Sequence, residues 1–166
     1  IAGARLAVDH LVALGHRRIA HVSGGDNRIA RERRTGYERA IADHRLESFV
    51  VEGAFTEQGG YAGAEAAVAE GATALVVAND LAAIGALAAL RSRGLRVPED
   101  VAVVGYDGMR LLHSLDLTTV AQPLADMGRV AADLLMERIA QPDRPSVHRE
   151  VETRLISRGS SGVLSG

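Results

Sequence analysis

Residues 73–107 have the sequence TALVVANDLAAIGALAALRSRGLRVPEDVAVVGYD, and this stretch decides the fold. Two short apolar runs, 73–78 and 101–105, flank a segment in which apolar side chains recur every three or four residues. The recurring positions include Ile84, Leu87 and Leu90. This period is typical of an amphipathic helix, and Gly94 supplies a helix end. The stretch therefore predicts a strand, a helix and a second strand.

The same unit of strand and helix precedes this stretch twice. Apolar runs at 19–23 and 49–51 predict strands, and helical periodicity follows them at 30–44 and around Ala64. Apolar strands that alternate with helices are typical of a parallel sheet, because each right-handed crossover lays a helix on one face of the sheet. The sequence thus predicts an α/β fold, a parallel sheet with helices on both faces.

The two ends of the chain have weaker patterns. Residues 4–14 predict a helix already under way at the first residue, so we expect the chain to begin inside a longer protein. Residues 118–121 predict a short extended connector, and Pro123 stands where a long helix begins. The apolar stripe of this helix comprises Met127, Val130, Ala131, Leu134, Leu135 and Ile139. Residues 147–155 alternate loosely, as an edge strand does, and the Gly/Ser-rich tail from Arg158 is expected to fray.

Composition excludes several functions. The formal net charge is −2, so nothing in the overall electrostatics draws this chain to a phosphate backbone, and DNA binding is expected to lie outside it. All basic residues are arginine, which excludes lysine chemistry, and the sequence has no cysteine for a disulfide or a thiolate. No apolar run approaches the ~20 residues of a membrane span.

Common catalytic and metal-binding motifs are also absent from the sequence. It has no G-x-S-x-G elbow, no G-x-G-x-x-G fingerprint and no phosphate-loop signature, and Ser23-Gly24-Gly25 is too short a match to support one. The six histidines include no pair spaced i, i+4 on one helix. We therefore expect a protein that is not an enzyme and that uses neither a metal nor a cofactor.

Two charged side chains follow predicted strands, at the edge where ligands bind in an open α/β sheet. Arg31 lies in the first helical turn after the first strand, where its guanidinium could grip a hydroxyl pair or a carboxylate. A solvated helix face is the commoner use of such an arginine. Asp107 ends the last strand of the opening stretch, where its carboxylate could bind vicinal hydroxyls or form an Asx turn.

Phe55 and Asn79 are the other two candidates at this edge. Phe55 follows a strand, so its ring could stack on a sugar or purine, or could fold back into the core. Asn79 precedes a helix, where it could cap the helix N-terminus or contact a ligand through its amide. The residues at this edge together predict a site for a small polar ligand.

Six segments resemble motifs of the lactose/purine-repressor (LacI) family of bacterial transcription regulators, and they occur in the expected order. They are LGHRRIA at 14–20, ARERRTGY at 30–37, ANDLAAIG at 78–85, VPEDVAVVGYD at 97–107, TTVAQPL at 118–124 and RGSS at 158–161. The segments extend over nearly the whole chain and keep plausible spacing, so the resemblance is specific.

The resemblance implies the C-terminal part of an effector-sensing domain whose two α/β lobes resemble periplasmic sugar-binding proteins. Residues 1–121 would be the second lobe, and residues 122–141 a crossing helix that packs on a first lobe outside this chain. Residues 142–158 would form a return strand, and residues 159–166 a tail. In the family, DNA is bound by a helix-turn-helix that precedes the sensing domain, and the protein is cytoplasmic and dimeric.

Two apolar surfaces need partners under this resemblance. The family forms homodimers through this lobe, and plausible contributors are Leu87, Leu90 and the Leu111-Leu112 segment. Without the first lobe, we expect the apolar stripe of the crossing helix either to fold back on this lobe or to contact a neighbouring chain.

The resemblance also implies residues that contact a sugar or purine effector from the second lobe. These are Arg31, Phe55, Asn79 and Asp107, with Arg33 and Gln122 as weaker candidates. Ile29 stands where many relatives have a small polar residue, and Gly108 where a second acidic residue is usual. Both departures bear on the identity of the ligand.

The expected function is to sense a small sugar or purine-like effector that controls DNA binding by an N-terminal domain absent from this chain. The alternative is a sugar-binding protein of a transport system, which shares the fold and would be secreted. An α/β enzyme that uses Asp107 and Arg31 is a third hypothesis. In the intact protein, Asp107→Ala is expected to abolish the effector response and to leave folding nearly unchanged.

Overall fold

The computed structural model describes residues 1–162, except for the side chains of residues 111–113. Six strands form one sheet in the order β2-β1-β3-β4-β5-β6. The strands are β1 (Ile19–Val22), β2 (Val50–Val51), β3 (Ala74–Val77), β4 (Ala102–Asp107), β5 (Thr118–Ala121) and β6 (Arg154–Ile156). The α-helices are α1 (Ala2–Ala13), α2 (Arg28–Asp43), α3 (Glu57–Ala69), α4 (Asp80–Ser92) and α5 (Leu124–Ala140), and the 3-10 helices are η1 (Arg110–Leu115) and η2 (Gly159–Ser161).

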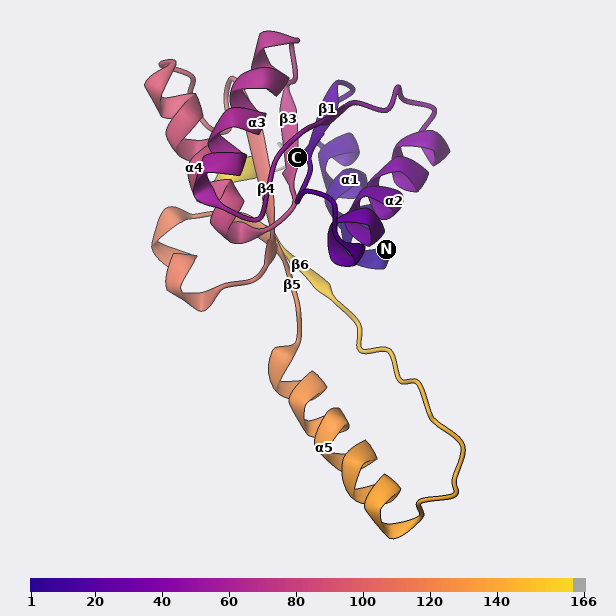
Figure 1. The fold of residues 1–166 in the computed structure, drawn as a ribbon. Coiled ribbons are helices and arrows are strands. Elements are labelled where there is room, and N and C mark those ends of the chain that lie inside the picture. The colour runs from indigo at the N-terminus through magenta and orange to yellow at the C-terminus, as the bar shows by residue number, and fades with distance from the viewer. Residues whose placement is uncertain (163–166) are drawn as a thin grey trace.

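Strands β1 to β5 are parallel, whereas β6 pairs antiparallel with β5. Helices α3 and α4 cover one face of the sheet, and α1 and α2 cover the other (Figure 1). Alternate strand residues point to opposite faces of the sheet. Ala20 and Val22 therefore belong to the core on the side of α3 and α4, and Ile19 belongs to the core on the side of α1 and α2. The predicted α/β fold, a parallel sheet with helices on both faces, is confirmed.

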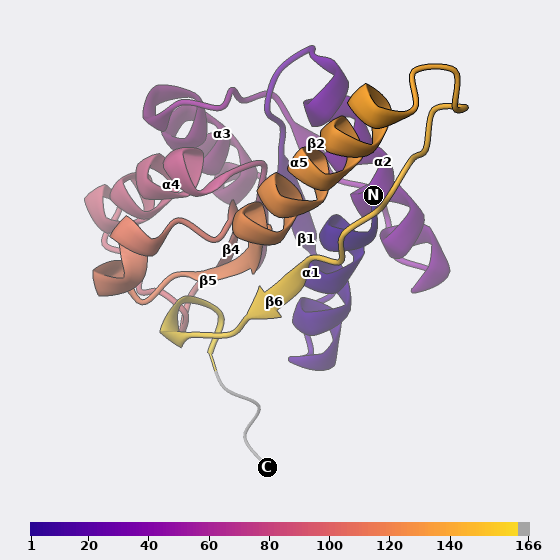
Figure 2. The same ribbon diagram turned by 90° about the horizontal axis from the view of Figure 1, so that it is seen from below.

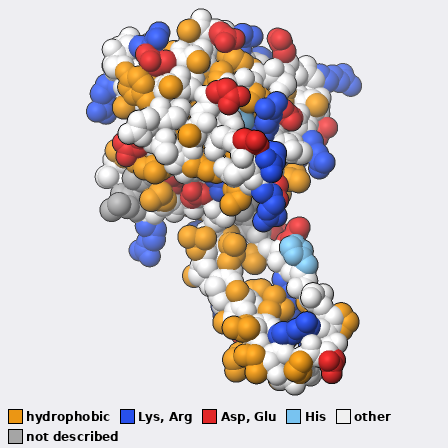
Figure 3. All heavy atoms as spheres, viewed as in Figure 1, with side chains coloured by type: hydrophobic (Ala, Val, Ile, Leu, Met, Phe, Trp, Pro, Cys, Tyr) orange, Lys and Arg blue, Asp and Glu red, His pale blue; other side chains and the backbone are white. Residues whose placement is uncertain are grey.

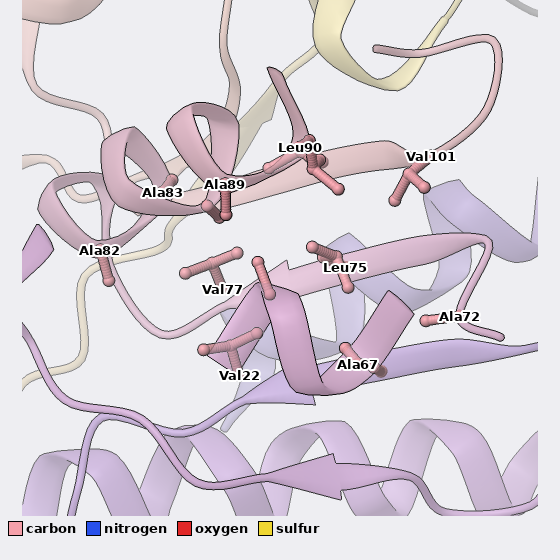
Figure 4. Packing of buried hydrophobic residues seen from close by; sticks show 14 of the residues in the cluster. Val22, Ala67, Ala72, Leu75, Val77, Ala82, Ala83, Ala89, Leu90 and Val101 are labelled. Atoms are coloured by element: carbon pink, nitrogen blue, oxygen red, sulfur yellow. The ribbon is translucent and has the colours of Figure 1, made fainter. Parts of the chain in front are cut away.

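Small residues let helices α3 and α4 approach each other closely. An added Cβ at Gly60 would lie 1.8 Å from the carbonyl oxygen of Ala82, and one at Gly85 would lie 1.8 Å from the carbonyl oxygen of Glu57. Below these helices, Val22 and Val77 of the sheet pack against alanines of α3 and α4 (Figure 4). Glycine and alanine at these positions therefore allow the two helices and the sheet to pack closely.

The C-terminal segment departs from its predicted structure. Residues 118–121 are a buried strand paired on both sides, and β6 lies beside them (Figure 2). The tail from Arg158 was expected to fray. In its described part, η2 is ordered, with Ser160 and Ser161 buried, whereas residues 163–166 lie outside the described residues. The hydroxyls of Ser160 and Ser161 bond to the amide of Thr118 and to its Oγ1, at 2.8 and 2.7 Å. Hydrophobic periodicity does not reveal such polar anchors, which explains the wrong prediction.

Helix α5 extends away from the lobe (Figure 1), and no residue in it is buried. Its apolar side chains gather on the surface of this projecting arm (Figure 3). The most exposed are Leu124, Leu135, Met136 and Ile139. The helix does not fold back on the lobe, which contradicts one of the two expectations for its stripe.

One predicted contributor to a dimer surface is wrong. Leu90 is fully buried in the core between α4 and the sheet, so its side chain cannot reach a second chain. Leu87 is partly buried against the same core and lines a hollow beside α4, and the side chains of Leu111 and Leu112 lie outside the described residues. Among the described helices, none has the length and apolarity to cross a membrane.

Candidate functional site

The site lies where the order of the strands reverses. From β1 the chain goes outward to β2, and it then crosses over to β3 and β4 on the other side of β1. The connections that leave β1 and β3 therefore diverge above the carboxyl ends of these strands, where open α/β sheets place their ligands. Helix α2 begins after β1, and α4 begins directly after β3.

Arg33 is the centre of this edge. Helix α2 is capped by Asn27, whose side chain accepts from the amide of Ala30 at 3.0 Å, and the helix then directs Arg33 over the ends of β3 and β4. The guanidinium donates to the carbonyl oxygen of Ala78 and, at 2.8 Å, to Oδ1 of Asp107. An arginine whose side chain is only 11% exposed needs such partners, because an unpaired buried charge is costly.

Two aromatic rings flank the same guanidinium. Its Cζ atom lies 3.9 Å from the ring centroid of Tyr106 and 5.4 Å from that of Phe55. The Phe55 ring packs directly on Gly24, where an added Cβ would come within 2.4 Å of it. Phe55 stays partly exposed, so its ring forms a wall of the site instead of folding into the core.

Asp107 faces Arg33 from the end of β4. Its Oδ1 accepts from Nη2 of Arg33 and, at 2.7 Å, from Nε2 of Gln122, while no donor in the described part of the chain reaches its Oδ2. The backbone of Asp107 has φ +117°, a left-handed value that non-glycine residues rarely adopt, and such values concentrate at functional sites. The free oxygen can accept hydrogen bonds from the hydroxyls of a ligand.

Asn79 caps α4, because its side-chain oxygen accepts from the amide of Ala82 at 2.8 Å. This is the capping role that the sequence allowed, and it leaves the side-chain NH₂ group of Asn79 available. Asn79 is partly exposed and adjoins Ala78, whose carbonyl oxygen binds Arg33. The structure thus brings Arg33, Phe55, Asn79, Asp107 and Gln122 to one edge of the sheet.

Arg31 lies apart from this group. Its guanidinium pairs with Asp26, and its side chain is 62% exposed. It lines a polar hollow of about 400 Å³ between α2 and the residues that follow β1 and β2, together with Ser23, Arg34 and Glu52. The weaker sequence candidate, Arg33, is therefore the arginine that faces Asp107.

Two residues of the site were not predicted from the sequence. Tyr106 lies under the guanidinium of Arg33, and Asp80 is a buried carboxylate behind Asp107. Burial raises the pKa of Asp80, and the negative charge of Asp107 raises it further, while hydrogen bonds from Thr119 and Met109 oppose the shift. The position of Asp80, directly after Asn79 at a strand end, was the available signal.

A mainly apolar hollow lies away from this edge. It has a volume of about 600 Å³, lies between α4 and η1, and is lined by Ile84, Leu87, Leu95 and Pro98 among others. Within the described residues, no cluster of histidine and carboxylate side chains has the arrangement needed to hold a metal ion.

Known proteins resemble this chain over nearly its full length. Residues 8–161 match the family of periplasmic binding protein-like domains. The HTH-type transcriptional repressor PurR of Haemophilus influenzae is 39% identical over 149 residues, which are 85% of this chain and 44% of that protein.

Two solved structures share the fold closely. A LacI transcriptional regulator from a Rhodococcus species is 36% identical with a TM-score of 0.92, and the match covers 98% of this chain and 62% of that one. The transcriptional regulator CelR in complex with cellobiose is 39% identical with a TM-score of 0.88, and the match covers 96% of this chain and 51% of that one.

The chain spans about half the length of the curated relatives it matches. The resemblance inferred from the six sequence motifs is confirmed by these relatives, which are transcriptional regulators. The chain belongs to the family of periplasmic binding protein-like domains, and within it to the lactose/purine-repressor type found in transcriptional regulators.

Proposed function

We propose that this chain is the C-terminal lobe of the effector-sensing domain of a transcriptional regulator, and that the group around Arg33 and Asp107 binds a sugar or a nucleobase. The supporting observation is the ion pair between Arg33 and Asp107. A guanidinium held between two aromatic rings faces a carboxylate that keeps one oxygen free, at the switch point of the sheet. Bidentate polar groups beside an aromatic face suit hydroxylated rings and planar bases.

The chemistry of each side chain assigns its role in this proposal. Asp107 accepts hydrogen bonds from ligand hydroxyls or ring N–H groups through Oδ2, and Arg33 donates to ligand oxygens or ring nitrogens. Phe55 offers a partly exposed ring face on which a ligand stacks. The side-chain NH₂ groups of Asn79 and Gln122 supply further donors beside them.

These residues form one side of a binding site, and we propose that a preceding lobe forms the other. Helix α5, with its exposed apolar side chains, would pack on that lobe as the crossing helix, with residues 142–158 returning to the sheet. A ligand held between two lobes favours their closed arrangement by its differential affinity, and closure would alter the spacing of N-terminal DNA-binding domains in a homodimer.

The two other hypotheses have less support. The relatives named above are transcriptional regulators, so the transport protein and the enzyme are not favoured. The complex of CelR with cellobiose makes a sugar the first ligand to try.

A thermal-shift screen of the intact regulator tests the proposal. The panel comprises pentoses, hexoses, cellobiose, adenine and guanine. A compound present at about 100 times its dissociation constant stabilises the protein by about 2.7 kcal/mol, which raises the melting temperature measurably. We expect at least one compound to do so.

The matched variant for this screen is Asp107→Asn. It keeps an acceptor for Arg33 and Gln122. Asp107→Ala would instead leave the buried guanidinium without its carboxylate and would itself lower stability, so the expectation from the sequence that this variant leaves folding nearly unchanged was wrong. Asp107→Asn is expected to lose most of the thermal shift. A panel without any shift, or a shift unchanged by Asp107→Asn, would refute the proposed site.

A further inference from the structure

Asp80 is a buried carboxylate that the proposed binding site does not use directly. It is the first residue of α4 and is 1% exposed. An aspartate at a helix N-terminus is favoured by the helix dipole, but that benefit does not require burial. Here burial and the neighbouring Asp107 both raise the pKa of the carboxyl, so its position costs free energy that other contacts must offset.

Those contacts come from the turn that follows Asp107. Oδ2 of Asp80 accepts from the amide of Met109 at 2.7 Å, and Oδ1 accepts from the hydroxyl of Thr119 at 2.6 Å. The same hydroxyl accepts from the amide of Gly108 at 3.2 Å. Two successive amides after Asp107 are therefore anchored, one by Asp80 and one by Thr119.

The anchored turn has an uncommon backbone. Asp107 and Gly108 both have positive φ, at +117° and +74°. Left-handed values at a non-glycine residue persist where the surroundings enforce them. The direction of the Asp107 side chain, and so its bond to Arg33, depends on this conformation.

The sheet leaves room for this arrangement at one glycine. An added Cβ at Gly105 would lie 2.4 Å from Oδ1 of Asp80. Gly105 is paired with Thr119 across β4 and β5, so the carboxylate occupies the space over a residue without a side chain. The sequence of β4 thus accommodates Asp80 behind the site.

We propose that Asp80 and Thr119 are positioning residues, which hold the turn at residues 107–109 so that Asp107 is aimed at Arg33 and at the effector. This inference rests on the proposed function for its effector-binding consequence. Neither residue lies in the ligand-facing group, and both act through Asp107. The pair also links the site to η1, because Met109 is followed directly by that helix.

Thr119 offers a matched pair of variants for the test in the intact regulator. Thr119→Val is nearly isosteric and removes both bonds of the hydroxyl, whereas Thr119→Ser retains the hydroxyl. The first readout needs no effector: arginine-selective ¹⁵N labelling reports the side-chain resonance of Arg33. We expect Thr119→Val to move this resonance towards its position in Asp107→Asn, and Thr119→Ser to leave it near that of the wild type.

The second readout is a double-mutant cycle on effector affinity. It uses cellobiose, or the compound of the panel above that gives the largest thermal shift. We expect Thr119→Val to weaken binding about tenfold, and Thr119→Ser to remain within about threefold of the wild type. In the Asp107→Asn background, Thr119→Val should change the dissociation constant by less than about twofold, because Thr119 acts through Asp107.

A merely structural role predicts different results. The effects of Thr119→Val and Asp107→Asn on affinity would then add, or Thr119→Val would lower stability without any change in affinity. Either outcome, or an Arg33 resonance unmoved by Thr119→Val, overturns the inference.

Asp80→Asn, which leaves one acceptor for two donors, should move the Arg33 resonance in the same direction. If no compound of the panel binds the wild type, the proposed function fails, and the Arg33 resonance still decides whether Asp80 and Thr119 position Asp107.

Discussion

Arg31 and Arg33 are two residues apart on one helix, and they lie in different environments. A separation of two residues turns a side chain by about 200° around the helix axis. Arg33 therefore points over the sheet, while Arg31 points to solvent. At the scale of a residue, this turn decides which arginine faces Asp107.

Arg33→Lys and Arg31→Lys form a matched pair of substitutions. A lysine at position 33 keeps the charge but cannot bond to Ala78 and Asp107 with the same fork or stack flat on Tyr106. We expect Arg33→Lys to lower the free energy of unfolding by about 1–2 kcal/mol, and Arg31→Lys to change it by less than about 0.5 kcal/mol. Urea denaturation measures both values. Equal effects of the two substitutions would contradict the structure.

His21 provides a pH-dependent test of the core between the sheet and helices α1 and α2. It lies in β1, stacks on Tyr37 with ring centroids 5.2 Å apart, and donates from Nδ1 to the carbonyl oxygen of Val76 at 2.9 Å. Burial lowers its pKa from 6.5 to about 4, so the ring is neutral in the folded chain near neutral pH. Its Nε2 has no hydrogen-bond partner in the described structure.

This depressed pKa fixes the sign of the pH dependence. Below pH 6.5 the unfolded chain binds a proton at His21 that the folded chain does not, so stability falls as the pH drops from 6.5 towards 4. The loss from this one group is on the order of 3 kcal/mol at its limit. We expect His21→Leu to reduce the fall in unfolding free energy between pH 7 and pH 4.5, measured by urea denaturation. An identical pH dependence in both proteins would show that His21 is not buried in its neutral form.

At the scale of the element, the close contact of α3 and α4 depends on two glycines. Gly85→Ala would place a methyl group against the carbonyl oxygen of Glu57, and α3 would have to shift. We expect a loss of about 3 kcal/mol in the free energy of unfolding, at the upper end of overpacking effects. Gly128→Ala in α5 is the control, because nothing lies within 4 Å of its added Cβ. There the substitution should leave stability unchanged or raise it by up to about 1 kcal/mol. A similar result at both glycines would contradict the close crossing.

The elements of the lobe could be predicted because their signal is local. Strands β1, β3 and β4 are short apolar runs, and α2, α3 and α4 have a helical period that the sheet then buries. Strand β5 was harder to predict, because Thr118 and Thr119 are polar residues that are buried by pairing on both sides. Residues 159–161 were predicted wrongly, since serine hydroxyls hold them and not apolar side chains.

The residues of the candidate site were predicted in part for a similar reason. The parallel strands β1 to β5 all end at one edge of the sheet, so Phe55, Asn79 and Asp107 could be named from position alone. The choice between Arg31 and Arg33 required the direction of helix α2, which depends on tertiary packing. Asp80 was not singled out, because a buried carboxylate cannot be distinguished from a solvated helix start in a single sequence.

At the scale of the whole molecule, α5 is an arm with an unburied apolar surface. Leu135 and Met136 are 60% and 66% exposed in this chain. We expect Leu135→Ser and Met136→Ser each to change the unfolding free energy of the 166-residue chain by less than about 0.5 kcal/mol. In the intact regulator, where α5 is proposed to pack on the preceding lobe, at least one of them should cost about 2 kcal/mol or more. A large cost already in the short chain would show that α5 packs on this lobe.

The central claim is that the edge of the sheet around Arg33 and Asp107 binds a small effector. Its most direct test is a crystal structure of the intact sensing domain with the compound that stabilises it most. We expect this compound to form hydrogen bonds with Oδ2 of Asp107 and with the guanidinium of Arg33, and to lay one face against Phe55. A compound bound instead beside Arg31, or in the apolar hollow between α4 and η1, would contradict it.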